Sequence, residues 1–400
     1  MKRAIPESLA VVPHRRDFAG RRPRVSLLLN SAMPDYASLV RGCVEAAEQT
    51  GRIEVFYRGS WSGDISNEIT AGGGRVAGIL CRATAPEHMA YLRRCHRPVV
   101  FVEQDHVAGF PSVRADNAAI GRMAAEFLLA KGHRRFGFLG VEGSLYSDER
   151  EQAFAEIIHR SGNELISCHL PFGNANRVQT QMPMERWLSS LPRPVAVLAD
   201  MTTHAREIVA LCESFGFAVP EEVAVLSCDN DDLLCATIHP SISGIDQNMW
   251  RVGYEATMVM IRLLAGETIP RKPLYILPSG VVERQSTDSF AISDRRLATA
   301  LNRIRTTAAT GKISMEEVAR TAGLSRRALQ LRFRTVLGRT VQQEIVRVRI
   351  DAARRLLLSS HLSMSEVAEH CGYESGPVFT RAFYRETGVT PSAFRRKVIR

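Results

Sequence analysis

Short apolar runs alternate with segments of helical periodicity through most of the chain. The runs are typical of buried strands, and the segments between them space their apolar residues three and four positions apart, as one-sided helices do. The predicted strands are residues 25–29, 53–57, 76–81, 99–102, 136–140, 166–170, 195–199, 223–227 and 275–278. The predicted helices are residues 39–49, 118–130, 149–160, 184–191, 204–215 and 254–264.

This alternation favours parallel sheets covered by helices. The pattern restarts near residue 136, which indicates two Rossmann-like lobes within one α/β domain over residues 25–290. Ligands of such sheets bind beyond the carboxyl ends of the strands. We therefore expect a ligand site in a cleft between the two lobes.

The last quarter of the chain contains an internal repeat instead. The segment Ser314-Met-Glu-Glu-Val-Ala319 recurs 49 residues later as Ser363-Met-Ser-Glu-Val-Ala368. Each copy predicts a helix, a glycine turn, a serine cap and a second helix, which is the pattern of a helix-turn-helix. Residues 341–359 read as one connecting helix. The expected buried positions of the first copy are Val318, Ala319, Leu329 and Phe333.

Composition and charge change this picture by showing where an anionic partner would bind. The 400 residues are 45% hydrophobic and 24% charged, as in globular proteins of several domains. Residues 295–400 hold 21 basic and 8 acidic side chains, whereas residues 25–294 hold 24 and 32. The excess positive charge therefore lies on the repeat and favours nucleic acid as a partner. Residues 1–24, with 7 basic and 2 acidic side chains, are expected to be a disordered arm.

Several classes of protein are excluded by the absence of their motifs. No apolar stretch is long enough to span a membrane, and residues 1–24 lack the apolar core of a secretory signal. The eight cysteines form no CxxC pair, so we expect reduced thiols in a cytoplasmic protein, with no metal and no cofactor. A phosphate-binding loop, a nucleophile elbow and H-E-x-x-H are also absent, which argues against an enzyme. The alternative is a carbohydrate- or nucleotide-processing enzyme with a basic tail that binds nucleic acid.

Acidic residues recur where predicted strands end. Asp116, Asp200 and Asp229 occupy such positions, and Arg150 lies in the predicted loop that opens the next helix. Carboxylates accept hydrogen bonds from sugar hydroxyls, and a guanidinium donates several in a fixed geometry. The set therefore suits a polyhydroxylated ligand. The alternative is that each aspartate caps the following helix.

The same region resembles the LacI/GalR-type sugar-sensing module. The resemblance rests on Arg114-Ala-Asp-Asn117, Phe136-Gly-Phe-Leu-Gly140 and Val223-Ala-Val-Leu-Ser-Cys-Asp-Asn230. It implies a two-lobed fold of the type I periplasmic-binding-protein class that closes around a sugar. Asn30 and Trp61, after the first and second strands, are candidate contacts from the first lobe, although Trp61 would also suit a packing role. The positions that the resemblance marks as sugar contacts are Asp116, Arg150, Asp200 and Asp229.

Residues 295–400 resemble the AraC-type double helix-turn-helix DNA-binding domain, an all-α fold. The closing motif reads Cys371-Gly-Tyr373, Thr390-Pro391 and Phe394-Arg395. At Leu331 the chain departs from relatives, which often have a polar or basic residue there. Ser375 is expected to cap the second recognition helix, with Pro377 in its first turn. The expected DNA contacts are Arg326, Arg327, Gln330, Thr380 and Arg381 with bases, and Arg334 with phosphate.

Taken together, the two regions resemble AraC-family regulators of the xylose-regulator type. The resemblance implies a transcription activator that binds promoter DNA as a homodimer and recruits RNA polymerase. It also implies control by a small sugar such as xylose, and a cytoplasmic, nucleoid-associated location. Differential affinity of the sugar for two conformations would provide the control.

Overall fold

The structure is a computed structural model that places most of the chain in two compact units. The first unit combines the described residues up to Ala115 with Asn248–Ile276, and the second combines Asp116–Gln247 with the described residues from Leu277 onward. Two predicted ligand contacts, Asn30 and Trp61, lie outside the described residues. The structure describes residues 22–29, 36–57, 76–82, 86–104, 107, 109–171, 177–270, 272–288, 294–308, 313–359 and 362–397.

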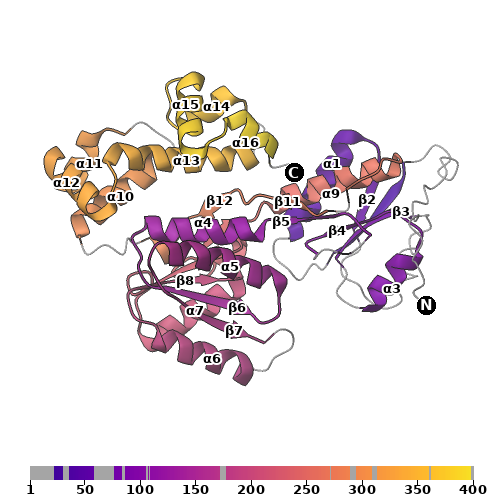
Figure 1. Cartoon of the computed structure of the whole chain (residues 1–400), viewed down its shortest axis with the longest axis horizontal. Helices are drawn as coiled ribbons and strands as arrows, with labels where there is room; N and C mark the ends of the chain where they lie inside the picture. Colours follow the sequence, from indigo (N-terminus) through magenta and orange to yellow (C-terminus); the bar gives the residue numbers. More distant parts are fainter. Residues whose placement is uncertain are drawn as a thin grey trace. The chain divides into compact units, whose positions relative to one another are not determined.

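The first unit contains a six-stranded sheet in the order β11-β5-β4-β3-β1-β2, in which every pair is parallel. Figure 1 shows α1 and α9 on one face of this sheet and α3 on the other. The strands are β1 (Arg24–Leu28), β2 (Glu54–Tyr57), β3 (Val76–Cys81), β4 (Val99–Val102), β5 (Ser112–Ala115) and β11 (Leu274–Ile276). The helices are α1 (Tyr36–Thr50), α3 (Pro86–Arg94) and α9 (Met249–Leu264).

Two glycines allow α1 and α9 to pack with their backbones in contact. A methyl group added at Gly253 would lie 1.9 Å from the carbonyl oxygen of Leu39. One added at Gly42 would lie 1.9 Å from the carbonyl oxygen of Trp250. Any larger side chain at either position would therefore have to force the helices apart.

The second unit contains a six-stranded sheet in the order β12-β10-β9-β8-β6-β7, in which only β12 runs antiparallel to its neighbour. Helices α4 and α5 cover one face, and α6 and α7 cover the other (Figure 1). The strands are β6 (Phe136–Val141), β7 (Leu165–Leu170), β8 (Val195–Ala199), β9 (Val223–Ser227), β10 (Ser243–Asp246) and β12 (Gly280–Val282). The helices are α4 (Asn117–Ala130), α5 (Leu145–Arg160), α6 (Arg177–Ser190), α7 (Thr202–Phe215), α8 (Asp232–Ala236) and the 3₁₀ turn η1 (Gln285–Thr287).

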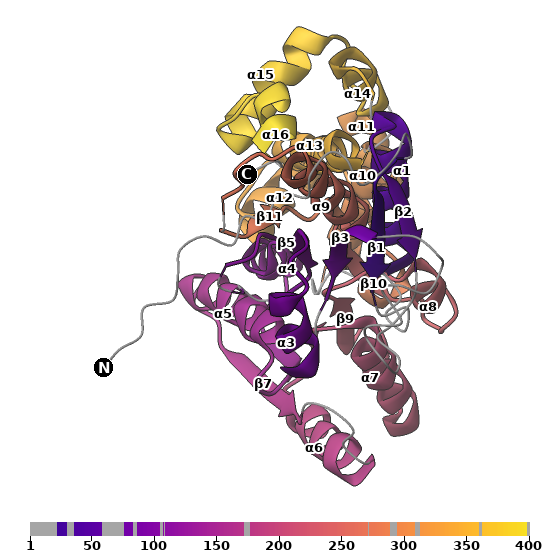
Figure 2. The same ribbon diagram turned by 90° about the vertical axis from the view of Figure 1, so that its right-hand side faces the viewer.

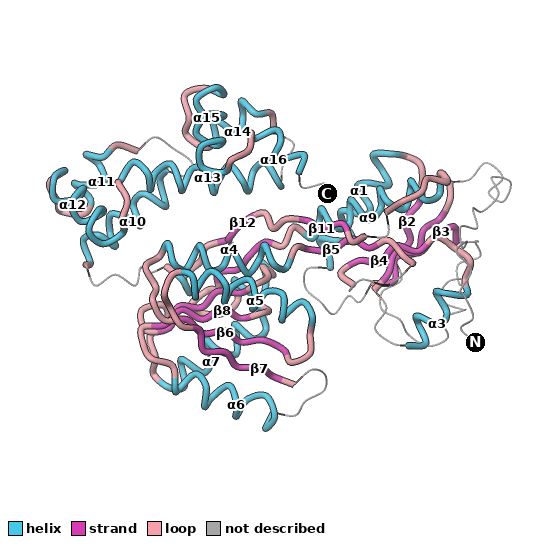
Figure 3. The backbone as a smooth tube through the Cα atoms, in the orientation of Figure 1, coloured by secondary structure: helices cyan, strands magenta, loops and turns pink. Residues whose placement is uncertain are grey.

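The described residues from 294 onward form helices only (Figures 2 and 3). They build two apolar cores, and α13 contributes to both: Ile345 packs in the first core, and Ile350 and Leu357 pack in the second. One long helix thus connects the two copies of the repeat. The helices are α10 (Arg295–Ala308), α11 (Met315–Thr321), α12 (Arg326–Leu337), α13 (Val341–Ser359), α14 (Met364–His370), α15 (Gly376–Thr387) and α16 (Pro391–Lys397).

The predicted order of strands and helices is confirmed, with corrections at particular places. Helix α5 begins at Leu145 and not at 149, so Arg150 lies within the helix and not in a loop before it. The polar residues of its first turn hid this start, because they interrupt the apolar spacing. Arg24, assigned to the N-terminal arm, begins β1. Strand β5, which carries the buried Arg114, was not predicted, nor were the short strands β10 and β12 or the helices α3 and α8.

We predict that Gly253→Ala destabilises the protein by about 1–3 kcal/mol, because the new methyl group overlaps the α1 backbone. Alanine otherwise favours a helix over glycine, so steric overlap is the only reason for a loss. Gly376→Ala is the matched control, since its methyl group would meet only Ser365 Oγ at 3.9 Å. Denaturant unfolding measures both changes. A Gly253→Ala variant as stable as the wild type would contradict this packing.

Candidate functional site

Two aspartates follow adjacent parallel strands in the second unit. Asp200 comes directly after β8, and Asp229 lies two residues after β9, with Ala199 opposite Ser227 in the strand register. The amide of Asp200 donates to the carbonyl oxygen of Leu139 on β6 at 2.9 Å, so the backbone of Asp200 continues the hydrogen bonding between β8 and β6. Parallel strands end at the same sheet edge, so these side chains start from neighbouring positions.

The guanidinium of Arg150 is buried and held by two hydrogen bonds. Its Nε donates to Asn117 Oδ1 at 2.9 Å, and its Nη1 donates to the carbonyl oxygen of Asp200 at 2.6 Å. Asn117 in turn donates to Glu149 Oε2 at 3.0 Å. The ring of Tyr146 lies 5.1 Å from the guanidinium carbon. Side chains of α5 and α4 and the end of β8 therefore fix the orientation of the positive charge.

The carboxylate of Asp229 accepts two short hydrogen bonds through Oδ1. Thr202 Oγ1 and Ser227 Oγ each donate to it at 2.5 Å. Burial raises the pKa of Asp229 above its ordinary value, although these two hydrogen bonds and the charge of Arg150 favour the ionised form. The carboxylate is therefore fixed in direction by its neighbours.

Asp200 is fully buried and is oriented by a histidine on the following helix. Its Oδ1 lies 2.6 Å from Nδ1 of His204, whereas no described residue forms a hydrogen bond with its Oδ2. Burial lowers the pKa of His204. The hydrogen bond and charge of Asp200, with the charges of Glu207 and Asp229, outweigh burial and raise that pKa above 6.5. The histidine is therefore protonated more readily than a free imidazole, and it stands beside a buried carboxyl group whose Oδ2 has no hydrogen-bond partner among the described residues.

The aspartates differ in whether they cap a helix. Asp116 is the N-cap of α4, and its Oδ1 accepts from the amide of Ala119 at 2.8 Å. The residue at the N-cap of α7 is Met201, and that of α8 is Asp231. Asp116 therefore caps the helix that follows it, as the alternative predicts, whereas neither Asp200 nor Asp229 occupies the N-cap of the helix that follows it.

Four supporting residues of this cluster were missed by the sequence analysis. Asn117 follows Asp116 directly, Thr202 opens α7, and Ser227 ends β9. His204 stands four positions after Asp200, the spacing at which helical side chains meet, and that spacing was a usable signal. The four supply the hydrogen bonds that orient Arg150, Asp229 and Asp200.

The first repeat copy forms a helix-turn-helix. Gly323 turns the chain with a φ of +61°, and the hydroxyl of Ser325 caps α12 by accepting from Ala328 at 3.2 Å. Leu329 and Phe333 are buried, as predicted, so the opposite side of α12 is exposed.

The second copy repeats this arrangement 50 residues later, with Phe379 and Phe383 buried on α15. The prediction that Ser375 caps this helix is wrong in one respect. Ser375 stands at the N-cap position, but its side chain makes no capping hydrogen bond. Pro377, in the first turn as predicted, removes one of the amide donors that such a cap uses.

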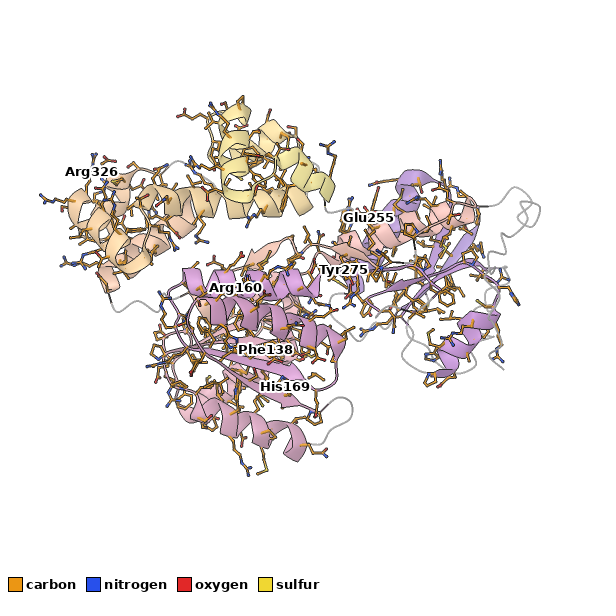
Figure 4. The ribbon with its side chains drawn as sticks, viewed as in Figure 1. Phe138, Arg160, His169, Glu255, Tyr275 and Arg326 are labelled. Carbon is orange, nitrogen blue, oxygen red and sulfur yellow. The ribbon has the colours of Figure 1, made fainter. Side chains whose placement is uncertain are left out.

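The predicted DNA contacts occupy different environments. Arg326 lies on the surface of the first motif (Figure 4), where it forms an ion pair with Glu316. Gln330 contacts the sulfur of Met315 at 3.5 Å. Thr380 is half-buried on α15. Arg327, Arg334 and Arg381 are exposed on the sides of α12 and α15 that face away from the apolar cores.

The remaining candidate chemistry is limited. All eight cysteines are free thiols, and six of them are buried. Within the described ranges, no group of three or more His, Cys, Asp or Glu side chains could hold a metal ion. None of the described helices has the length and apolar character to cross a membrane.

Comparisons with known proteins find relatives of both the α/β region and the helical region of the chain. Residues 125–287 match a periplasmic binding protein-like domain, and residues 318–397 match a helix-turn-helix domain. A xylose operon regulatory protein of Haemophilus influenzae is 29% identical over 388 residues, covering 93% of this chain and 98% of that protein. Its counterpart in Escherichia coli K12 is 31% identical over 287 residues, covering 71% and 73%. The solved structure of a xylose-binding transcription activator has a TM-score of 0.60, with 26% identity and coverage of 94% and 98%.

A binding-protein-like sensor joined to a double helix-turn-helix defines a transcription regulator of the AraC class, not an enzyme. The chain belongs to the family of xylose operon regulatory proteins.

We predict that Asp200→Asn lowers the pKa of His204 relative to the wild type, because burial persists while the hydrogen bond and charge of Asp200 are lost and only the charges of Glu207 and Asp229 remain. NMR titration measures this value, and loss of the signal in His204→Gln assigns it. In the wild type the raised pKa stabilises the folded protein below pH 6.5, and this contribution is lost as pH rises through the folded pKa. An unchanged His204 pKa in Asp200→Asn would contradict the pairing.

Proposed function

We propose that the chain is a transcription activator whose DNA binding is controlled by a monosaccharide, xylose or a close relative. The observation that carries this proposal is the Asp200 carboxylate. It is buried and held by His204 through Oδ1, and no described residue donates to Oδ2. A sugar hydroxyl is a suitable donor for this oxygen. The names of the relatives, xylose operon regulators and a xylose-binding activator, support an aldopentose.

The neighbouring residues supply the other contacts that a sugar needs. Asp229 offers a second oriented carboxylate. Arg150 has five N–H groups, of which the bonds to Asn117 and Asp200 use two. Asp116 contributes the carboxylate oxygen that does not cap α4. Asn30 and Trp61 stay predicted contacts from the first lobe, the tryptophan by stacking on the sugar ring.

The domain assignment divides sensing from DNA binding. Residues 24–290 form the sugar sensor, since Arg24 begins β1, residues 295–400 form the DNA-binding domain, and the basic N-terminal arm ends before Arg24. The sugar controls DNA binding by stabilising one of two conformations, which requires different affinities for the two. The active form is a homodimer in the cytoplasm, bound to promoter DNA of the nucleoid and in contact with RNA polymerase.

We predict that xylose raises the melting temperature of the full-length protein and that Asp200→Asn weakens xylose binding about 10- to 100-fold. The loss corresponds to about 1.5–3 kcal/mol for a hydrogen bond to a charged group. Xylose at 100 times its dissociation constant should stabilise the wild type by about 2.7 kcal/mol. A thermal-shift titration against aldoses, ketoses and sugar acids makes the measurement.

Asp232→Asn is the matched control, because this aspartate lies in the same unit at the exposed start of α8 and pairs with Arg284. It should leave sugar affinity unchanged. Equal xylose affinity in the wild type and Asp200→Asn would refute the site, and a protein that responds to no sugar in the panel would refute sugar control.

A further inference from the structure

An apolar residue occupies the centre of the DNA-facing side of the first recognition helix. Leu331 on α12 is 65% exposed, the highest exposure of any large apolar side chain among the described helical residues from 294 onward. Exposing a leucine to water gains nothing for folding, since burying one contributes about 1.5–3 kcal/mol. The packing of the domain therefore gives no reason for leucine at this position.

The helical geometry places Leu331 opposite the core. Leu329 and Phe333, two residues before and two after it, are both fully buried. At about 100° per residue, Leu331 points away from the midline between this buried pair. Arg327 and Arg334, four residues before and three after, flank it on the same exposed face. A leucine between two arginines thus forms the centre of the surface that would enter the groove.

The second recognition helix has the same geometry and different chemistry. Phe379 and Phe383 are fully buried on α15 and correspond to Leu329 and Phe333 with an offset of 50 residues. Arg381 stands between them and is exposed, in the position that corresponds to Leu331. The repeat therefore presents methyl groups in one helix and a guanidinium in the other, on matched backbones.

From this difference between the two recognition helices, we infer that Leu331 selects a thymine in one half-site by contact with its C5-methyl group. Arg381 selects a guanine in the other half-site. Thymine alone among the four bases presents a methyl group in the major groove, and arginine pairs with guanine O6 and N7. Leucine offers no hydrogen bond, so a cytosine amino group or a guanine oxygen facing it would lose its water without replacement. The inference rests on the proposed DNA-binding function of α12 and α15.

The test uses the full-length protein with xylose and the duplex that it selects from random DNA. Each thymine of that duplex is replaced singly by deoxyuridine, which keeps base pairing and removes only the methyl group. Replacing one particular thymine of one half-site should weaken wild-type binding to the duplex about four-fold, which is the effect of one buried methyl group. The Leu331→Ala variant should bind the thymine and deoxyuridine duplexes with nearly equal affinity. In Leu331→Arg the preferred base at this position should change to guanine.

Val336→Ala is the matched control, because this valine is 41% exposed on the same helix but lies on a different side from Leu331. It should keep the four-fold methyl effect. The inference is overturned if no deoxyuridine weakens the wild type, or if Leu331→Ala keeps the full effect. It is also overturned if Leu331→Ala reduces transcription but leaves DNA affinity unchanged, since that result would assign the leucine to a protein contact. Failure to select any sequence would instead refute the proposed DNA-binding function.

Discussion

The candidate ligand chemistry depends on one buried positive charge. Arg150 enters the second lobe from α5 and donates to Asn117 on α4 and to the backbone of Asp200 after β8. A buried guanidinium is costly unless hydrogen bonds and opposite charge surround it. Those requirements determine which side chains can stand at these strand ends, and Asp229 provides one of the compensating charges. The arrangement that satisfies Arg150 thereby also fixes the orientation of the charged groups from which we propose the sugar site.

The DNA-binding region meets a different constraint, the separation of two recognition helices. Helix α13 packs in the first core through Ile345 and in the second through Ile350 and Leu357. Its 19 residues correspond to about 28 Å at 1.5 Å per residue, close to the roughly 34 Å between successive major grooves. Each motif then needs only its own small core, and its exposed face is free to vary. Leu331 and Arg381 show how far that variation extends.

Much of the fold was predictable because burial leaves a periodic trace in the sequence. The strands β3, β4, β8 and β9 are continuous apolar runs, and their bounds were predicted as found. Strand β5 was missed because Arg114 interrupts its apolar run, and its charge is accommodated beside the ring of Tyr275, 5.9 Å away.

The candidate site was predictable only in part. A polar residue after a buried strand is visible in sequence, and Asp200 and Asp229 were found in this way. Sequence does not distinguish a capping aspartate from a ligand-binding one, since both occupy the same turn, as Asp116 illustrates. Nor does it reveal long-range partners such as Asn117 and Arg150, which only the packing of α4 on α5 brings together.

Thermodynamic coupling between sugar and DNA tests the central claim most directly. If xylose changes DNA affinity by some factor, bound DNA must change xylose affinity by the same factor. Calorimetric titration of xylose into the free protein and into its operator complex measures this. We predict tighter xylose binding in the complex, by the factor with which xylose tightens DNA binding, commonly about 5- to 150-fold. Equal xylose affinity in both titrations would contradict sugar control of DNA binding.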